Sequence, residues 1–418
     1  MKKKTLLASS LSLLLLSACS SGPAEGGANS IDIAGSFEQP TELKVSQLGK
    51  NIRYVPLETT DSSLIGASPI VQILKDKILI TTDKRSLLFD KTSGKYLRSI
   101  GQKGNGPKDY SAPTCYVNSI TGELCYHRQG NKMVAYNQEG KYVGEIILPQ
   151  ELSKTFYFIA SDSQLIGYYG EEIGSKDKCR LYNFDRQGEI KDSLDINPCD
   201  QAEEESFSPA DINSISVFNN KADGKYGLLC QNGMMLLNYK DGNTECCVFH
   251  PHVLWHSDGK TRFRNVYGDT IYTLKGKELQ PYLAFYTGQW HQPVASIGEK
   301  GTEDLFTVTY AMESPNSLFF QCIRGMFINN QVFNGIYDKK NGKTYMNKRE
   351  AALTDDLTHF MPFQPETCSE EGEFAALLDI DSIREWLDEH PETAPDGKLE
   401  FLNTLAEDAN PVCVIVEP

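Results

Sequence analysis

The chain lacks the short motifs that mark most metal and hydrolase sites. Its 11 cysteines include no Cys-x-x-Cys pair, which argues against a zinc ribbon or a thioredoxin-type centre. HExxH, GxSxG and EF-hand loop patterns are also missing. Basic residues are scarce, because 41 lysines and arginines stand against 56 aspartates and glutamates. An acidic chain without a basic stripe repels phosphate backbones, so we expect no nucleic-acid partner.

The N-terminus carries a processing signal and a lipid-attachment site. Three lysines precede an apolar run that ends at Leu16, and this run is shorter than the roughly 20 residues a helix needs to span a bilayer. Leu16-Ser17-Ala18-Cys19 then has the pattern of a lipobox. The alternative is a buried helix that ends in an ordinary cysteine. We expect residues 1–18 to be a signal peptide, and Cys19 to carry the lipid that anchors the chain to a membrane.

The segment after Cys19 is predicted to be a tether. Residues 19–35 are rich in glycine, serine and alanine and show no periodicity. Cleavage removes three basic residues and no acidic ones, so the mature chain carries a net charge of −18. We expect a protein of the cell envelope, lipid-anchored at the outer membrane, with its periplasmic or surface face left open.

The body of the chain repeats an apolar strand, a polar turn and a second strand. In the strongest copies an aromatic residue, such as Phe89, Tyr136 or Phe184, precedes an Asp or Asn that opens the turn. The turn glycines are Gly94, Gly140, Gly188, Gly242, Gly276 and Gly342. A hairpin and an aromatic residue recurring about every 50 residues are typical of a β-propeller. We therefore predict an all-β, six-bladed propeller over residues 36–418, with seven blades left open.

The two ends of the body are expected to close the ring together. Residues 51–58 and 411–416 both have the pattern of strands, and pairing them in one blade would leave no open sheet edge. Between about 374 and 407 the composition changes, which predicts a short helical insertion in the last blade. Asp381 is the expected N-cap of a helix over 382–390.

Several of these segments resemble a known family. They are residues 54–58, 88–101 and 269–274, the element Gly104-Asn105-Gly106-Pro107-Lys108-Asp109-Tyr110, and Asn410-Pro411-Val412. Together they resemble the NHL-like six-bladed propeller lipoproteins of Bacteroides and relatives, over most of the mature chain. The resemblance implies the fold and an envelope location, and it brings no catalytic residues with it. Lys108 departs from the small residue that the family often has at this place.

The loop that carries this element is the predicted binding site. Lys103 and Lys108 are candidate polar donors to a ligand, and Tyr110 is a candidate aromatic contact. The stretch Gly101–Pro107 invites comparison with a phosphate-binding loop. It lacks the Lys-Ser/Thr ending of such a loop and opens no helix, so an irregular connection between blades is the better interpretation.

Three histidines form the best metal-like cluster in the sequence. His250, His252 and His256 would share one face of a strand, because side chains alternate along it. Three imidazoles suit zinc or copper, but Pro251 disturbs the strand and no fourth ligand is evident. A surface loop with unrelated histidines is the preferred interpretation. Cys115 and Cys125, which flank a turn-like segment, are candidates for a disulfide across a hairpin.

The functional hypothesis that follows is a non-enzymatic one. We expect a binding or scaffold propeller of the envelope whose ligand is a glycan, a peptide or a partner protein. The alternative is an NHL-like metal-dependent lyase or lactonase with its site in the central channel. The first hypothesis requires no cofactor, whereas the second requires a metal ion.

Overall fold

The computed structural model describes residues 29–112, 114–150, 157–161, 164–169, 179–196, 211–221, 229–242, 244–249, 252–297 and 300–418. Predicted position His250 lies outside them, as do the signal peptide and Cys19. Over the described ranges, no helix has the length and apolar character that crossing a membrane requires.

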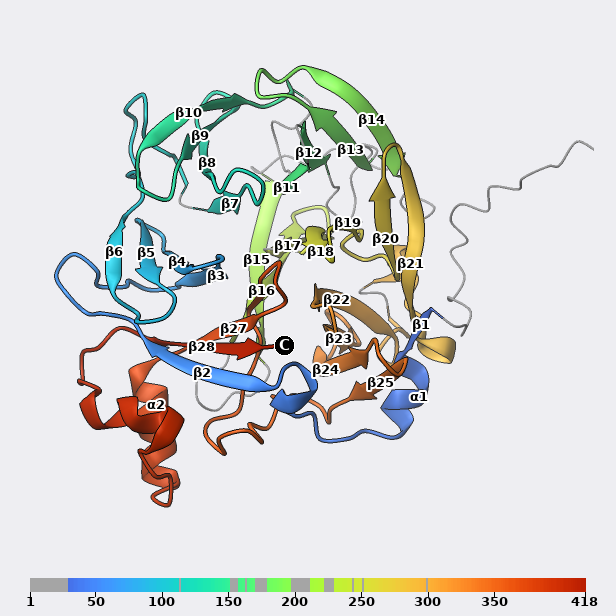
Figure 1. Ribbon diagram of the computed structural model, residues 1–418. Helices are drawn as coiled ribbons and strands as arrows, with labels where there is room; N and C mark the ends of the chain where they lie inside the picture. Colours follow the sequence, from blue (N-terminus) through green and yellow to red (C-terminus); the bar gives the residue numbers. More distant parts are fainter. Residues whose placement is uncertain are drawn as a thin grey trace, which may run out of the picture.

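Six sheets, each with four antiparallel strands, form a ring around a central axis, and one of them gains a fifth, parallel strand (Figure 1). Blade 1 contains β3 (Ile70–Ile73), β4 (Lys77–Thr81), β5 (Ser86–Asp90) and β6 (Tyr96–Ser99). Blade 2 contains β7 (Cys115–Val117), β8 (Leu124–Arg128), β9 (Lys132–Tyr136) and β10 (Tyr142–Ile147). Blade 3 contains β11 (Tyr157–Ser161), β12 (Gln164–Tyr169), β13 (Cys179–Phe184) and β14 (Ile190–Ile196).

The second half of the ring is built in the same way. Blade 4 contains β18 (Leu254–Ser257), β19 (Lys260–Phe263), β20 (Thr270–Lys275) and β21 (Glu278–Tyr286). Blade 5 contains β22 (Phe306–Glu313), β23 (Ser317–Arg324), β24 (Gln331–Asp338) and β25 (Lys343–Met346). Blade 6 contains β26 (Thr367–Cys368), β27 (Phe374–Leu378), β28 (Val412–Glu417) and β2 (Asn51–Pro56).

The predicted closure of the ring is confirmed. N-terminal β2 pairs antiparallel with C-terminal β28, from Asn51 opposite Glu417 to Pro56 opposite Val412. Because the outer strand of blade 6 comes from the start of the chain, the two ends of the body hold each other in one sheet. The ring therefore cannot open between blades 6 and 1 without breaking the β2–β28 strand pair.

A large hydrophobic cluster fills each seam between consecutive blades, and a smaller one around Met326 lies on blade 5. Phe89 lies in the cluster between blades 6 and 1, and Tyr136 in the cluster between blades 1 and 2. Phe184 lies between blades 2 and 3, and Phe263 between blades 3 and 4. Two further clusters fill the seams between blades 4 and 5 and between blades 5 and 6. The aromatic residues Phe89, Tyr136 and Phe184, which precede repeat turns, therefore pack between stacked sheets, as their position in the repeat predicts.

The turn chemistry predicted from the repeat is present. In blade 1 an Asp90 carboxylate oxygen accepts hydrogen bonds from the backbone amides of Thr92 (3.1 Å) and Ser93 (2.7 Å). Gly94 closes the turn with a φ of 69°, a conformation that side chains with a Cβ rarely adopt. Its carbonyl accepts from the Glu58 amide at 2.9 Å, so the turn also fixes the chain that leaves blade 6.

One of the six turn glycines does not belong to a blade. Gly242 lies between β16 (Leu229–Tyr239) and β17 (Thr244–Phe249), which form a separate three-stranded sheet with β15 (Ile212–Lys221). Inner strand β11 of blade 3 contacts inner strand β18 of blade 4 directly, so this sheet is an insertion between them. Blade 6 has no such turn, because its outer strand comes from the N-terminus. The predicted number of six blades is confirmed, but one of the six turns on which the prediction rested lies outside the blades.

The ordered body begins earlier than the predicted tether would allow. β1 (Ser30–Asp32) adds a parallel fifth strand to blade 4 through β21, and α1 (Ile33–Glu38) follows it. The side chain of Asp32 caps α1 by accepting from the Gly35 amide at 2.8 Å. The chain then runs past blade 5, where the Thr41 amide donates to the Met346 carbonyl at 2.8 Å, before it enters blade 6.

The helical insertion is also shorter at its start than predicted. Phe374–Leu378 is strand β27, and α2 spans Ile380–Glu389, followed by the 3-10 helix η6 (Gly397–Thr404). The N-cap is Asp379 rather than Asp381, because its carboxylate accepts from the Ser382 amide at 2.9 Å. Asp379 and Asp381 have the same N-cap signal in the sequence. Asp379 is the cap because β27 ends at Leu378, directly before it.

The proposed pairing of Cys115 with Cys125 is not formed. Cys115 lies opposite Tyr126 in the β7–β8 ladder, and Cys125 lies opposite Tyr116. This register places the two thiols on opposite faces of the sheet, so Cys115 packs toward blade 1 and Cys125 toward blade 3. Both are free and buried.

Candidate functional site

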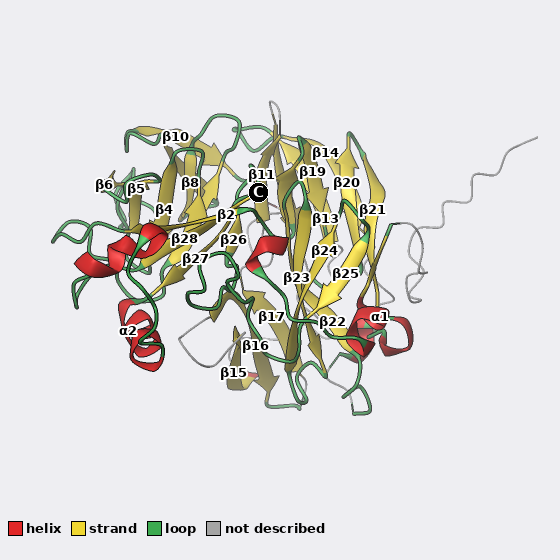
Figure 2. Cartoon of the chain, turned by 60° about the horizontal axis from the view of Figure 1, so that its bottom comes forward, coloured by secondary structure: helices red, strands yellow, loops and turns green. Residues whose placement is uncertain are grey.

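The two ends of the ring carry different kinds of segment. In an antiparallel meander, successive turns lie at alternate ends of the sheet. The turns after the first and third strands of each blade form one end, called here the turn end. The other end, the connection end, holds the segments between blades, the β15–β17 sheet and the blade 6 insertion. Figures 1 and 2 show β15–β17 across the middle of the ring and projecting beyond it, which places this sheet at one end of the ring axis.

The predicted binding loop lies at the connection end, between blades 1 and 2, and it folds around Asp109. This carboxylate accepts from the Gly106 amide at 2.8 Å and from Gln102 Nε2 at 2.9 Å. A Cβ on Gly104 would overlap the same carboxylate. The glycines therefore allow the backbone of the loop to pack closely against Asp109. This agrees with an irregular connection between blades.

Tyr110 and the two lysines of this loop have different surroundings. Tyr110 has no exposed surface, and its ring stacks on Tyr126 with 4.7 Å between centroids. It packs in the core and holds the loop, and it offers no face to a ligand at the surface. Lys103 Nζ donates to the Asp83 carbonyl at 3.0 Å, while Lys108 lies over the Tyr142 ring at 5.3 Å. Both lysines are exposed, and they remain predicted donors.

The structure describes two of the three predicted histidine ligands, and each has other contacts. His252 precedes β18, stacks on Trp255 with 5.0 Å between centroids, and its Nδ1 lies 2.7 Å from the Ala311 carbonyl. His256 lies within β18, with Nδ1 3.3 Å from Thr261 Oγ1. Burial lowers the pKa of His252. Among the described residues, no group of three or more His, Cys, Asp or Glu side chains is placed to hold a metal ion.

A buried ionic cluster lies in the seam between blades 4 and 5, and the sequence analysis did not predict it. Glu313, whose side chain has no exposed surface, accepts from Lys339 Nζ at 2.6 Å, Trp255 Nε1 at 2.8 Å and Arg262 Nε at 3.3 Å. The Arg262 guanidinium lies 3.5 Å from the centre of the Tyr282 ring. Burial raises the pKa of Glu313, but the two cations outweigh it and bring the pKa below its usual value.

This cluster lies at the turn end. Its charged side chains bind one another and join the strands of blades 4 and 5. Glu313 ends the first strand of blade 5, and Lys339 lies in the turn after its third strand. Similar pairs are Lys91 with Glu373 (3.0 Å) and Arg186 with Glu123 (2.6 Å), each joining a turn of one blade to the blade before it. The turn end is thus held together by ion pairs across seams. These contacts join residues far apart in the chain, so no local pattern shows them.

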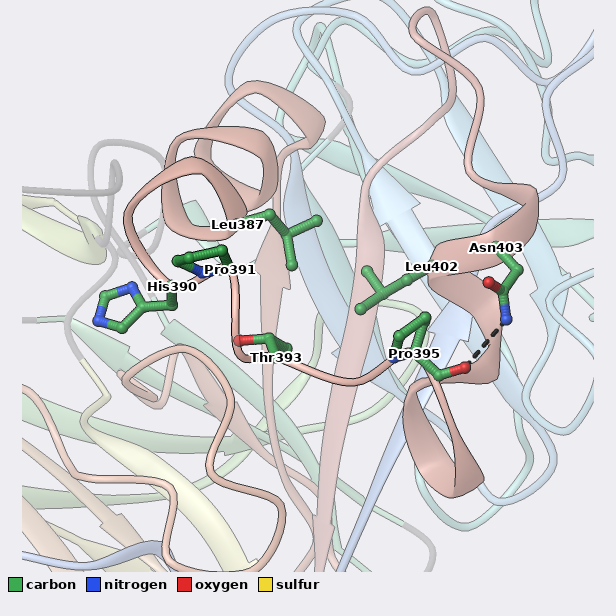
Figure 3. Close-up of a pocket in the computed structure, with 7 residues that line it drawn as sticks. All are labelled: Leu387, His390, Pro391, Thr393, Pro395, Leu402 and Asn403. Carbon is green, nitrogen blue, oxygen red and sulfur yellow. Dashed lines mark hydrogen bonds between the residues drawn. The ribbon is translucent and has the colours of Figure 1, made fainter.

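A shallow groove in the blade 6 insertion is the candidate site at the connection end. It has a volume of about 260 Å³ and lies between α2 and η6. Figure 3 shows Leu387 of α2 and Leu402 of η6 pointing toward one another across it. The remaining lining residues are His390, Pro391, Thr393, Pro395 and Asn403. The amide of Asn403 donates to the Pro395 carbonyl at 2.9 Å, which holds the connecting segment against η6.

The insertion that carries the groove is strongly acidic. Residues 379–411 contain ten aspartates and glutamates but only Arg384 and Lys398 as basic residues. Arg384 lies 3.7 Å from Glu407, and Lys398 Nζ donates to Asn51 Oδ1 on β2. This density of acidic residues is visible in the sequence and was the one available signal for the surface. The groove itself depends on how α2 packs beside η6.

Together these features define a six-bladed β-propeller that is closed by both ends of its chain and carries two insertions at its connection end. The model of the family described as a domain of unknown function, DUF4934, matches residues 28–417. The chain therefore belongs to this family.

Two solved structures are similar to this chain to different degrees. A protein of Bacteroides fragilis described as exported superposes with a TM-score of 0.59 at 17% identity, covering 92% of this chain and 98% of that one. The WD40 repeats of RRP9 match with a TM-score of 0.39 at 11% identity, covering 90% of this chain and 99% of that one. The likeness to the first of these supports the propeller fold. No curated protein matches the sequence.

Proposed function

We propose that this protein is an envelope lipoprotein that acts as a binding or scaffold propeller, anchored to the outer membrane through lipid on Cys19. The observation that supports the binding role is the groove between α2 and η6, which lies on a closed, rigid ring. Six seam cores and the β2–β28 closure hold the blades, so segments at the connection end have a fixed platform. Recognition elements commonly lie on loops that such a scaffold positions.

The envelope location rests on two independent observations. The sequence has the three parts of a lipoprotein signal in order, ending at Cys19. The similar structure from Bacteroides fragilis is described as that of an exported protein. The finer resemblance to NHL-like lipoproteins agrees with both. Lys103 and Lys108 are additional candidate contacts at the same end of the ring.

The anchor is tested by changing its single acceptor. Cys19→Ala should prevent incorporation of a labelled fatty acid and move the protein out of the outer-membrane fraction on a density gradient. Ser20→Ala is the matched control, because it leaves the lipobox residues in place. Protease treatment of whole cells then tells the surface face from the periplasmic one. Unchanged labelling of Cys19→Ala would refute the anchor.

The binding role is tested on the purified mature domain, residues 29–418. We expect at least one specific ligand in a combined glycan and peptide binding screen, and no stoichiometric metal by plasma mass spectrometry. A near-stoichiometric metal that disappears when His250 or His252 is replaced would overturn the binding role. It would instead favour a metal-dependent lyase or lactonase with its site in the channel.

A further inference from the structure

The groove between α2 and η6 combines an apolar floor with an acidic rim. Leu387 and Leu402 face one another across it, and Pro391 and Pro395 complete its apolar surface (Figure 3). Its volume of about 260 Å³ is below the roughly 300–1,000 Å³ of small-molecule pockets. The groove is therefore of a size for one or two side chains of a peptide.

The acidic residues of the rim alternate with the lining residues along the chain. Asp388 follows Leu387, Glu392 lies between Pro391 and Thr393, and Asp396 follows Pro395. Neighbouring Cα atoms are about 3.8 Å apart, so the backbone of each acidic residue directly flanks a residue that lines the groove. All three carboxylates are exposed.

The two basic residues of the insertion each have another contact. Arg384 lies on α2 before the groove and pairs with Glu407, outside the lining residues. Lys398 extends to Asn51 on β2. Arg384 also lies one helical turn before Asp388 and partly offsets its charge, so Glu392 and Asp396 contribute most of the negative potential at the groove.

The groove is held in shape by an aromatic cluster beneath the insertion. Tyr54 on β2 stacks on Phe401 of η6 with 5.5 Å between centroids. Phe360 contacts both Phe401 (6.4 Å) and Trp386 of α2 (6.3 Å). Both walls of the groove are thus fixed to blade 6. A site that is formed before binding loses less conformational entropy when its ligand arrives.

We propose that this groove binds a cationic peptide segment of a partner protein, with an apolar side chain inserted between Leu387 and Leu402 and lysine or arginine side chains at the rim. The inference rests on the proposed binding role and names its partner class. Charge complementarity selects the cationic segment, because the rim carries three exposed carboxylates beside an apolar floor. The apolar side chain gives register, while the charges speed association and make it sensitive to salt.

The test is selection of a random dodecapeptide library on the mature chain in 0.15 M salt. The selected peptides are then measured by fluorescence anisotropy. A rim variant carries Asp388→Asn, Glu392→Gln and Asp396→Asn; the Asp396 side chain makes no capping hydrogen bond, so η6 should be retained. The matched control carries Glu38→Gln, Glu139→Gln and Glu278→Gln, three exposed acids outside the insertion.

Two further variants test the floor of the groove. Leu402→Ser removes one apolar wall, and Thr393→Trp fills the groove from its rim without removing a core contact. Thermal unfolding shows which of them fold. Thr393→Trp keeps the test valid if Leu402→Ser is unstable.

We expect the selected peptides to carry lysine or arginine on both sides of an apolar residue. Their affinity should fall about tenfold or more in the rim variant and in Thr393→Trp, and stay unchanged in the control. Raising salt from 0.05 to 0.5 M should weaken binding in the wild type more than in the rim variant. Selected peptides without excess positive charge, or equal binding to every variant, would overturn the proposal.

The outcomes separate this inference from the binding role itself. Ligands that bind the wild type and all groove variants equally leave the binding role standing and place its site elsewhere. No enriched peptide and no glycan ligand, together with a stoichiometric metal, would refute both.

Discussion

Glu313 provides the most direct test of how the seam between blades 4 and 5 is held. The variant Glu313→Gln keeps the shape of the side chain and removes its charge. The Glu313 side chain has no exposed surface, and its cationic partners Arg262 and Lys339 are 3% and 15% exposed. The substitution therefore leaves two buried cations without a counter-charge.

The expected loss is large because removing one partner of a buried ion pair costs about 3–5 kcal/mol of stability. Arg262 cannot lose its proton, and its guanidinium is confined between Tyr282 and Thr273. Lys339 is closer to the surface, so it can turn toward water and recover part of the loss. We expect Glu313→Gln to reduce the free energy of unfolding by about 3 kcal/mol, at the lower end of that range.

The measurement is urea unfolding of residues 29–418, followed by fluorescence. The control is Glu350→Gln, whose partner Arg349 is 54% exposed, for which we expect less than about 1 kcal/mol. Adding Lys339→Met to Glu313→Gln should recover stability, because it removes one uncompensated cation and keeps an apolar stem. A loss below about 1 kcal/mol for Glu313→Gln would show that water reaches the cluster, and would refute this account.

Three further predictions concern single contacts in blades 1 and 2. Burial lowers the pKa of His127 from 6.5 to about 4. Between these pH values the unfolded chain therefore binds a proton that the folded chain does not. The free energy of unfolding of the wild type should fall by about 2 kcal/mol from pH 6.5 to pH 4, relative to His127→Phe. Parallel pH profiles of the two proteins would contradict this. A Cβ on Gly101, at a φ of 55°, would lie 2.6 Å from the Tyr136 ring. Gly101→Ala should therefore cost about 2 kcal/mol in chemical unfolding, and an unchanged midpoint would refute the contact. Cys115 and Cys125 should react with a thiol reagent only after unfolding, and a non-reduced peptide map that links them would contradict the register.

The architecture was accessible from sequence because propeller blades are built from local signals. An Asp or Asn that opens a turn, a glycine that closes it, and an aromatic residue in the preceding strand act within about ten residues of one another. The turn at Asp90 and Gly94 shows all of these contacts. The same local chemistry also occurs at Gly242, outside any blade, because a hairpin turn has the same requirements wherever the hairpin packs.

The candidate site was much less accessible. The loop with Lys103 and Lys108 was identified from its composition, but its glycines accommodate Asp109, and Tyr110 belongs to the core. Which side of a sheet a residue faces depends on register, and a shift of one residue reverses it. The positions of Tyr110 and of the two cysteines were decided in that way.

By itself, the sequence determined the repeated turns, the closing pair of strands and the acidic character of the insertion, and it has the pattern from which a lipid anchor at Cys19 is predicted. Each is a property of neighbouring residues or of composition. Only the tertiary structure decided that β15–β17 stands outside the ring, that Glu313 is surrounded by Arg262 and Lys339, and that α2 and η6 leave a groove between them. These features join segments that are distant in the chain. Their formation depends on which surfaces pack together when the ring closes, and no local pattern carries that information.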